Sequence, residues 1–369
     1  MKPILENNIK KILLVEKASL LNADFSDDDN KYINHEKYLW IRNTRWPFES
    51  YTLLSKVTGI SAFPDKRFKY WIEVLKNKGR GFKKRIGVFF RLPFKKVSYL
   101  PINADFYFDK NNFGILLYVT QAQPKVVKFN QSDDEAFITK IKSEASSLRL
   151  ANTIVHEVVK TPMLISAQSD KELYFFEQQV IFAKDLHILP ENKLGEIYDQ
   201  VFDFMYKLYI QEGISLVSPK NEGSIIQKAV GNYLDTIEGG KDIITKYNKL
   251  LAEDKKMFVG RIHGDLSLNN ILQAKRGQIW LIDWGESSIG YLAEDLKEHK
   301  GDVLSVYTKI AAHFDIKENK LYGLNEQVFI ADYIAASRLI DDNIVRENYD
   351  PYFQSKLKIR LQRMSRFIS

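Results

Sequence analysis

Strand-like and helix-like segments occupy separate parts of this sequence, and their separation limits the folds that the chain can adopt. Between residues 86 and 183 the chain carries short runs of β-branched and aromatic residues, divided by turn residues. From about residue 190 onward, apolar residues recur at helical spacing instead. A chain that gathers its strands before its helices is typical of an α+β protein, and here we expect two lobes.

Individual elements follow from these patterns. The predicted strands are "GVFFRL", "ADFYFD", "GILLYVTQ", "KVVKFN" and "LYFFEQQVIFA". The predicted helices begin, in chain order, at Pro64, Ser132, Asn192 and Asn325. We therefore expect a mostly β lobe over residues 97–178, a helical lobe over residues 179–369, and an N-terminal extension of unassigned role over residues 1–96.

The composition excludes several classes of site and of membrane protein. The chain has no cysteine, so disulfides, thiolate metal sites and cysteine nucleophiles are ruled out. No apolar run approaches the roughly 18 residues that span a bilayer. The N-terminal run "ILLV" is too short for the core of a signal peptide. We therefore expect a cytoplasmic protein.

Part of the net charge of +7 is concentrated in one segment. Residues 76–96, "KNKGRGFKKRIGVFFRLPFKK", contain many lysines and arginines and no acidic residue. One interpretation is a solvated surface loop with an edge strand, whose lysines prevent pairing with another chain. The other is a surface that touches anionic membrane headgroups, an acidic glycan or nucleic acid. We do not expect nucleic-acid binding, because no recognition motif accompanies the charge.

Three oxygen-bearing residues lie in strongly apolar surroundings in the second half of the chain. Asp265 and Asn270 belong to "HGDLSLNNIL", and Asp283 belongs to "IWLIDWG". Each alone could be a turn residue, but together they meet the requirements of phosphoryl transfer. Asn270 and Asp283 offer the amide and carboxylate oxygens that Mg²⁺ accepts beside nucleotide phosphates. The carboxylate of Asp265 can take the proton of an acceptor hydroxyl.

Two residues upstream complete this set. Lys128 lies at the end of the strand-like run "KVVKF", and Glu144 follows on a predicted helix whose apolar residues Ile141 and Leu148 should face the sheet. A carboxylate on such a face needs a partner, because the burial of an unpaired charge is costly. We predict that Glu144 pairs with Lys128, which would hold the nucleotide phosphates. The alternative is an ordinary surface ion pair.

Together with "VVKF", "SEASSL" and "GYLAEDL", these motifs resemble the catalytic core of the aminoglycoside-phosphotransferase and choline-kinase-like families, which share the protein-kinase fold. The resemblance covers residues 97–300. It implies a bilobal fold in which ATP and Mg²⁺ bind between a β N-lobe and a helical C-lobe. Asp265 would then be the catalytic base, Asn270 and Asp283 the Mg²⁺ ligands, and Lys128 the phosphate-binding residue beside Glu144.

Five more residues enter through the resemblance. His263 and Asp295 would brace the catalytic loop. Glu177 and Gln179 lie in "FFEQQV", where the family has its adenine-binding hinge. The loop that covers the phosphates should join the first two strands, and its candidate "DKNNFG" contains only Gly114. This match is weak, since each glycine admits one close approach of the backbone to a ligand.

The predicted reaction is transfer of the γ-phosphate of ATP to a hydroxyl of a small molecule or glycan, such as a cell-surface sugar. The positive net charge and the basic C-terminal residues argue against a polycationic acceptor, so we expect a neutral or anionic one. Ser267 stands where protein kinases acting on serine or threonine usually carry lysine. A protein kinase is therefore less expected and stays an alternative, together with a nucleotide-binding pseudokinase scaffold.

Overall fold

The computed structural model describes about two thirds of the chain. It includes the greater part of each helix and strand predicted after residue 100. The described residues are 30–36, 39–42, 97–100, 104, 106–109, 113–118, 122–130, 135–170, 173–181, 184–186, 190–222, 234, 239–274, 277–297, 301–314, 316, 318–346 and 351–368. The basic segment 76–96, the helix predicted from Pro64 and the strand predicted at residues 87–92 lie outside them.

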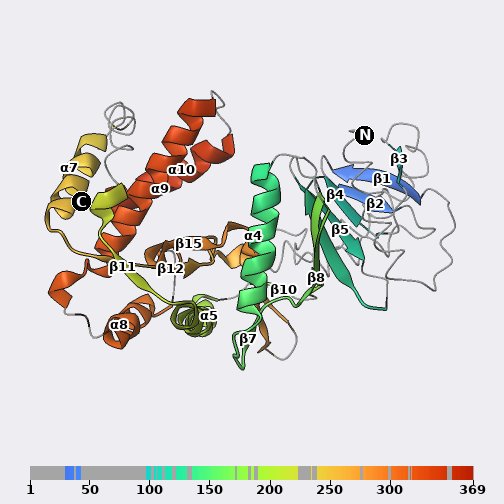
Figure 1. Ribbon diagram of the computed structural model, residues 1–369, viewed down its shortest axis with the longest axis horizontal. Helices are drawn as coiled ribbons and strands as arrows, with labels where there is room; N and C mark the ends of the chain where they lie inside the picture. The colour runs from blue at the N-terminus through green and yellow to red at the C-terminus, as the bar shows by residue number, and fades with distance from the viewer. Residues whose placement is uncertain are drawn as a thin grey trace. The chain divides into compact units, whose positions relative to one another are not determined.

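The chain divides into two compact units, and the first is built on an antiparallel sheet of eight strands in the order β3-β1-β2-β4-β5-β6-β9-β8 (Figure 1). Its strands are β1 (Asn30–Glu36), β2 (Leu39–Arg42), β3 (Val97–Leu100), β4 (Phe106–Asp109), β5 (Phe113–Tyr118), β6 (Lys125–Asn130), β8 (Leu164–Asp170) and β9 (Leu173–Gln179). The strands predicted at β4, β5, β6 and β9 are confirmed. Part of the N-terminal extension joins the same sheet, because β2 pairs with β4.

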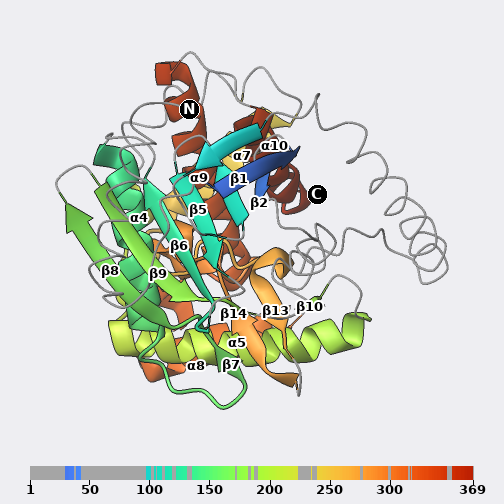
Figure 2. The same cartoon turned by 90° about the vertical axis from the view of Figure 1, so that its right-hand side faces the viewer.

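Helix α4 (Glu135–Ala151) packs on this sheet against β6, β8 and β9, and Figure 2 shows it beside these strands. Its apolar residues Ile141, Ala145 and Leu148 are buried. They recur every three or four residues and so form one stripe of the helix. This confirms the predicted helix and its sheet-facing side, on which Glu144 also lies.

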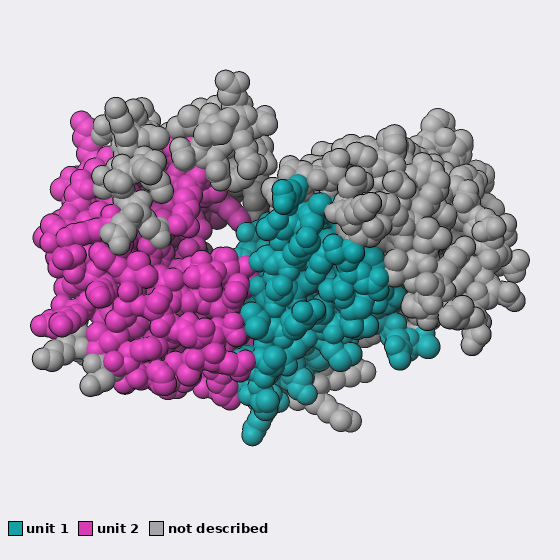
Figure 3. Space-filling view, viewed as in Figure 1, with its two compact units in different colours: residues 1–190, 267–286 teal, residues 191–266, 287–369 magenta. Residues whose placement is uncertain are grey.

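A second, four-stranded sheet completes the first unit. It has the order β10-β13-β14-β7 and consists of β7 (Val159–Lys160), β10 (Lys184–Asp185), β13 (Ile271–Gln273) and β14 (Ile279–Leu281). Strand β14 pairs in parallel with β7, which lies far upstream in the sequence. Residues 267–286 therefore belong to the first unit with residues 1–190 (Figure 3), although the flanking chain belongs to the second.

The second unit comprises residues 191–266 and 287–369 and is mainly helical. Its helices are α5 (Glu191–Glu212), α7 (Gly240–Ala252), α8 (Val303–His313), α9 (Leu324–Arg346) and α10 (Pro351–Arg366), and its small sheet joins β11 (Ser215–Val217), β12 (Met257–Ile262) and β15 (Ser288–Tyr291). Short 3-10 helices are η2 (Pro219–Glu222), η3 (Leu268–Asn270), η5 (Trp284–Glu286), η6 (Leu292–Glu294) and η7 (Glu318–Lys320), of which η3 and η5 lie in the first unit. The helices predicted at α5 and α9 are confirmed.

A buried ion-pair cluster fastens α10 to α9. The carboxylate of Asp332, which is almost fully buried, accepts from Arg360 Nη1 at 2.9 Å and pairs with Arg363 Nε at 2.5 Å. Glu294 lies beside the same cluster, 3.5 Å from Arg360 Nη2 and 3.9 Å from Lys297 Nζ. Two of the basic C-terminal residues are thus engaged inside the unit. Of the helices that the structure describes, none combines the length and apolarity needed to span a membrane.

Candidate active site

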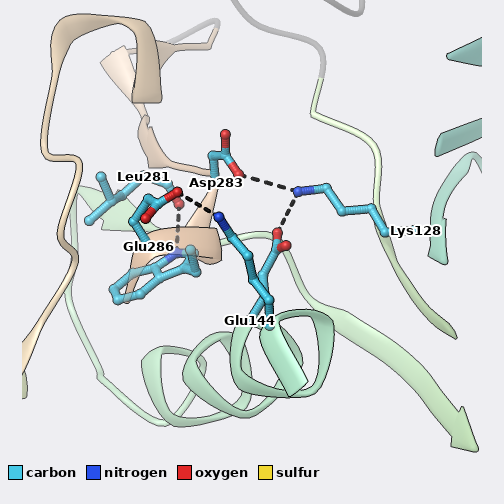
Figure 4. A network of polar contacts seen from close by, with 7 residues as sticks. Lys128, Glu144, Leu281, Asp283 and Glu286 are labelled. Carbon is cyan, nitrogen blue, oxygen red and sulfur yellow. Dashed lines mark hydrogen bonds and ion pairs between the residues drawn. The ribbon is translucent and has the colours of Figure 1, made fainter. Parts of the chain in front are cut away.

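Lys128 and Glu144 form a buried ion pair between β6 and α4. Lys128 Nζ donates to Glu144 Oε1, and it also lies 3.3 Å from Asp283 Oδ1 (Figure 4). Lys128 is 9% exposed and Glu144 is 7% exposed, so neither is an ordinary surface charge. The three residues come from a strand, a helix and the turn after β14, and the fold brings their charged ends together.

This cluster carries two carboxylates and one ammonium group, a net charge of −1. Burial raises the pKa of Glu144; the Lys128 ammonium offsets part of that rise and the Asp283 carboxylate adds to it. Burial by itself would lower the pKa of Lys128, but the carboxylates of Glu144 and Asp283 outweigh it and hold that pKa above its usual value. The excess negative charge thus favours any added positive charge, including a metal ion.

Asp283 and Asn270 lie at the same end of the β13–β14 pair. Ile271 is the register partner of Leu281, and just beyond this pair the N–H of Ile282 donates to the carbonyl oxygen of Asn270 at 2.9 Å. Asp283 adopts a left-handed backbone conformation with φ of 59°, which few residues other than Gly, Asn and Asp tolerate. Its side chain is 53% exposed, so the carboxylate is accessible to a ligand.

These two residues fit a magnesium ion that is bound together with a nucleotide. Within the described residues, no group of three or more acidic or histidine side chains is placed to hold a metal ion by itself. Mg²⁺ in nucleotide sites usually takes one or two protein oxygens and completes its shell with phosphates and water. Asp283 and Asn270 supply that kind of donor set, and Asp283 itself belongs to the cluster with excess negative charge.

In the second unit, Asp295 fastens the segment that leads into Asp265. Its carboxylate is fully buried and accepts from the backbone N–H of His263 at 2.7 Å and of Gly264 at 2.9 Å. The hydroxyl of Tyr209 donates to it at 3.0 Å. Gly264 has φ of 84°, a conformation that glycine adopts without steric cost. The backbone just before Asp265 is therefore held in one geometry.

Burial is the largest influence on the ionisation of this group. It raises the pKa of Asp295, while His263 and the donated hydrogen bonds offset part of the rise. Burial and the neighbouring Asp295 carboxylate raise the pKa of Tyr209, so its hydroxyl keeps the proton that it donates. The side chain of Asp265 itself is exposed. The interaction thus braces the backbone and leaves the Asp265 carboxylate accessible.

The predicted site residues divide between the two units. The first unit brings together Lys128, Glu144, Asn270 and Asp283, and the second brings together His263, Asp265 and Asp295. The chain passes from the second unit to the first between Leu266 and Ser267, in the middle of the "HGDLSLNN" motif.

The structure does not bring Glu177 or Gly114 into the Lys128 cluster. Val127 is the register partner of Glu177, and Lys128, one residue further, points to the opposite face of the sheet. Glu177 pairs with Lys125 Nζ at 2.6 Å. At Gly114, an added Cβ would lie 2.2 Å from the Phe129 ring, so close packing alone requires a glycine there.

Gln179 lies at the end of β9, and its backbone N–H donates to the carbonyl oxygen of Met163 at 2.9 Å. Of the "DKNNFG" loop, residues 110–112 lie outside the described part of the chain. The adenine-binding and phosphate-covering roles assigned to Glu177, Gln179 and Gly114 stay predictions.

Two contributors to the site were missed in the sequence. Tyr209 lies near the C-terminal end of α5, and nothing in the local pattern distinguishes it from a core tyrosine. Lys140 forms an ion pair with Glu286, with Nζ 2.8 Å from Oε1. Lys140 lies four residues before Glu144 on α4, and this spacing places both on one face of the helix. That spacing is the signal from which Lys140 could have been found.

Comparison with known proteins agrees with this geometry. Residues 88–362 match the family described as choline/ethanolamine kinase, whereas curated individual proteins give no match. Three solved structures of aminoglycoside phosphotransferases are also similar to this chain. The GDP complex of the wild-type 2'-phosphotransferase-IIIa is 15% identical, with a TM-score of 0.49 over 70% of this chain and 91% of that chain.

An apo thermostable mutant of APH(4)-Ia is 10% identical, with a TM-score of 0.45 over 70% of this chain and 92% of that chain. The streptomycin–ATP complex of APH(2")-IIa is 15% identical, with a TM-score of 0.42 over 69% and 89% of the two chains.

Proposed function

The chain belongs to the choline/ethanolamine kinase family and is an ATP-dependent phosphotransferase that acts on a hydroxyl group; we propose that the residues described above carry out this transfer and that Mg²⁺ is required. The observation that carries the assignment is the contact of Lys128 with both Glu144 and Asp283. A phosphate-binding lysine and a metal-binding carboxylate must lie close together, since both act on the same triphosphate.

In this proposal, Lys128 binds the phosphates of ATP, and Glu144 keeps its ammonium group directed at them. Asp283 and Asn270 hold Mg²⁺, which neutralises the charge on the phosphates when it is bound. The acceptor oxygen attacks the γ-phosphorus, the bond to the β–γ bridging oxygen breaks, and ADP leaves. The carboxylate of Asp265 takes the hydroxyl proton. His263 and Asp295 support this step through the backbone that precedes Asp265.

The acceptor that we propose is a small molecule or a glycan that is neutral or anionic. The net charge of +7 supports this choice, because a basic protein repels a polycation. The C-terminal region contributes less unpaired positive charge than the sequence predicted, because Arg360 and Arg363 are paired with Asp332. Peripheral contact of residues 76–96 with an anionic membrane is part of the proposal and rests on their charge.

The decisive experiment follows γ-labelled phosphate from ATP into a fractionated host extract. The fractions are small molecules, glycolipid with polysaccharide, and protein, and Asp265→Asn serves as the inactive control. We expect label that depends on Asp265 in the small-molecule or glycan fraction. Label in the protein fraction would refute the proposed acceptor class. No label in any fraction, with Mg-ATP still bound, would refute the catalytic assignment and favour a scaffold.

The metal assignment and the membrane contact have separate tests. Mg-ATP should raise the melting temperature of the wild type by mass action, and Asp283→Ala should lose most of that increase. An equal increase in the variant would contradict the role of Asp283 as a metal ligand. Neutralising the cations of residues 76–96 should weaken binding to anionic vesicles, and unchanged binding and acceptor KM would remove the membrane contact from the proposal.

A further inference from the structure

Helix α4 is joined to two different parts of the site through one face. Lys140 and Glu144 are four residues apart and so lie one above the other on the helix. Glu144 pairs with Lys128 of β6, and Lys140 pairs with Glu286 of η5, with 2.8 Å between Nζ and Oε1. Figure 4 shows Glu144 on α4 directed toward Lys128 and Asp283, with Glu286 close by. The helix thus contacts both the strand that carries the proposed phosphate-binding residue and the turn that follows the proposed metal-binding residue.

The turn that follows Asp283 is tightly fixed on its other sides. Trp284 is 1% exposed, and its indole N–H donates to the carbonyl oxygen of Leu281 at 3.3 Å. The backbone of Gly285 lies against two carboxylates, since an added Cβ would come within 3.4 Å of Glu144 Oε2 and 3.5 Å of Asp283 Oδ1. Glu286 lies three residues after Asp283, and its ion pair with Lys140 connects this confined turn to α4.

This confinement matters because Asp283 has a left-handed backbone conformation, which Asp tolerates better than most residues but which is still sparsely populated outside glycine. Its φ of 59° is a left-handed value, and such conformations persist only where the surroundings enforce them. The Asp283 side chain is half exposed, and its Oδ1 lies 3.3 Å from Lys128 Nζ. We expect the residues that follow it to help impose the conformation, because Trp284 is buried and Glu286 is paired with Lys140.

We propose that Lys140 and Glu286 are positioning residues whose ion pair keeps Asp283 in the conformation that binds the divalent cation. The inference rests on the proposed function, because it takes Asp283 as a metal ligand. Neither residue is proposed to touch nucleotide, metal or acceptor. The pair acts through the three-residue turn Trp284–Glu286, and its effect should be seen in cation affinity more than in protein stability.

The expected effect is moderate, because Lys140 and Glu286 are 49% and 45% exposed. Exposed ion pairs contribute little, and a pair of this kind corresponds to about a two- to fivefold change in an equilibrium constant. Glu286→Gln should therefore weaken the binding of Mn²⁺–ADP by about two- to fivefold. The same loss should occur in the wild type at high ionic strength, since salt screens exposed charges.

The test compares four proteins: wild type, Glu286→Gln, the charge-reversed double variant Lys140→Glu/Glu286→Lys, and a matched control, Lys207→Gln. The control removes the Lys207–Asp203 pair of α5, whose side chains are similarly exposed at 45% and 42%. Calorimetric titration with Mn²⁺–ADP gives the affinity for the metal–nucleotide complex, to which the cation ligands contribute. Hydrogen exchange of residues 282–286 in the nucleotide-free protein reports whether the turn is held, independently of activity.

We expect Glu286→Gln to weaken Mn²⁺–ADP binding and to speed exchange at residues 282–286. The double variant should restore both, and Lys207→Gln should match the wild type. Faster exchange with unchanged affinity would overturn the proposal, because the pair would then be structural only. Unchanged affinity and unchanged exchange would overturn it as well. A wild type that binds no Mn²⁺–ADP would refute the proposed nucleotide and metal site itself, which separates failure of the proposed function from failure of this inference.

Discussion

The hydrogen bonds of Asp295 allow the effect of a one-atom change to be worked out. Oδ2 of this buried carboxylate accepts from the N–H of His263 and the hydroxyl of Tyr209, and Oδ1 accepts from the N–H of Gly264. Asparagine has one oxygen in place of two. In either orientation its NH₂ group faces a backbone N–H, so at least two buried donors are left facing each other.

An unsatisfied buried donor costs about 1–3 kcal/mol. Two such donors would cost roughly 2–6 kcal/mol. Part of this cost is offset, because the neutral asparagine no longer buries a charge. We therefore expect Asp295→Asn to lower the free energy of unfolding by about 2–3 kcal/mol. Tyr209→Phe is the control, because Oδ2 keeps the His263 N–H as a donor, and its cost should be about 1 kcal/mol.

Urea denaturation of both variants measures these losses, and steady-state kinetics measures the effect on the reaction. Because Asp295 lies in the unit of Asp265 and Lys128 lies in the other, kcat should fall while the KM for ATP changes little. A shift of about 1 Å in a reacting group can reduce the rate about a hundredfold. If Asp295→Asn were as stable as Tyr209→Phe, the bonding scheme described here would be refuted.

Three further predictions test other parts of the structure. Asp332→Asn should lower the free energy of unfolding by about 3–5 kcal/mol, measured by chemical denaturation, because two arginines of α10 lose their buried counter-ion; a loss under about 1 kcal/mol would contradict the assigned cluster. Gly114→Ala should cost about 1–3 kcal/mol through its clash with the Phe129 ring, and adding Phe129→Leu should recover part of the melting temperature. Burial, with repulsion from neighbouring arginines, lowers the pKa of Lys297 in the folded chain below its usual 10.5. At pH values between the folded and the unfolded pKa, the unfolded chain binds more protons than the folded chain. The wild type should therefore gain stability relative to Lys297→Met as pH rises through that interval. A constant difference between the two proteins at pH 7, 8.5 and 10 would argue against the lowered pKa.

Local pattern was sufficient to predict the elements next to the site. The short run of β-branched and aromatic residues in "KVVKFN" predicted β6, and the apolar stripe around Ile141 and Leu148 predicted α4 and its buried face. The expectation that a carboxylate on that face needs a partner pointed to the Lys128–Glu144 pair, which the structure contains. These predictions depend on residues that are close in the sequence, or on one strong energetic requirement.

Long-range pairings could not be predicted in this way. The two-residue strands β7 and β10 are too short for a detectable period and exist because partners distant in the sequence pair with them. Tyr209 reaches Asp295 across 86 residues, and Lys140 reaches Glu286 across 146. The pairing of β2 with β4 likewise joins a segment with no recognised motif to the sheet. In each case tertiary contacts, and not local propensity, decide the structure.

The assignment of residues 267–286 to the first unit has a consequence for the synthesis of the chain. Strand β14 completes the small sheet by pairing with β7, and Asp283 completes the Lys128 cluster. When residue 190 leaves the ribosome, the first unit still lacks both, and about 100 further residues must follow, which takes about 5–20 s at ordinary elongation rates. The edge of β7 and the Lys128–Glu144 pair stay incomplete for that time. A chain ending at residue 190 should therefore fail to form a stable unit, and the nascent protein is most exposed to aggregation and chaperone binding while residues 191–286 are being made.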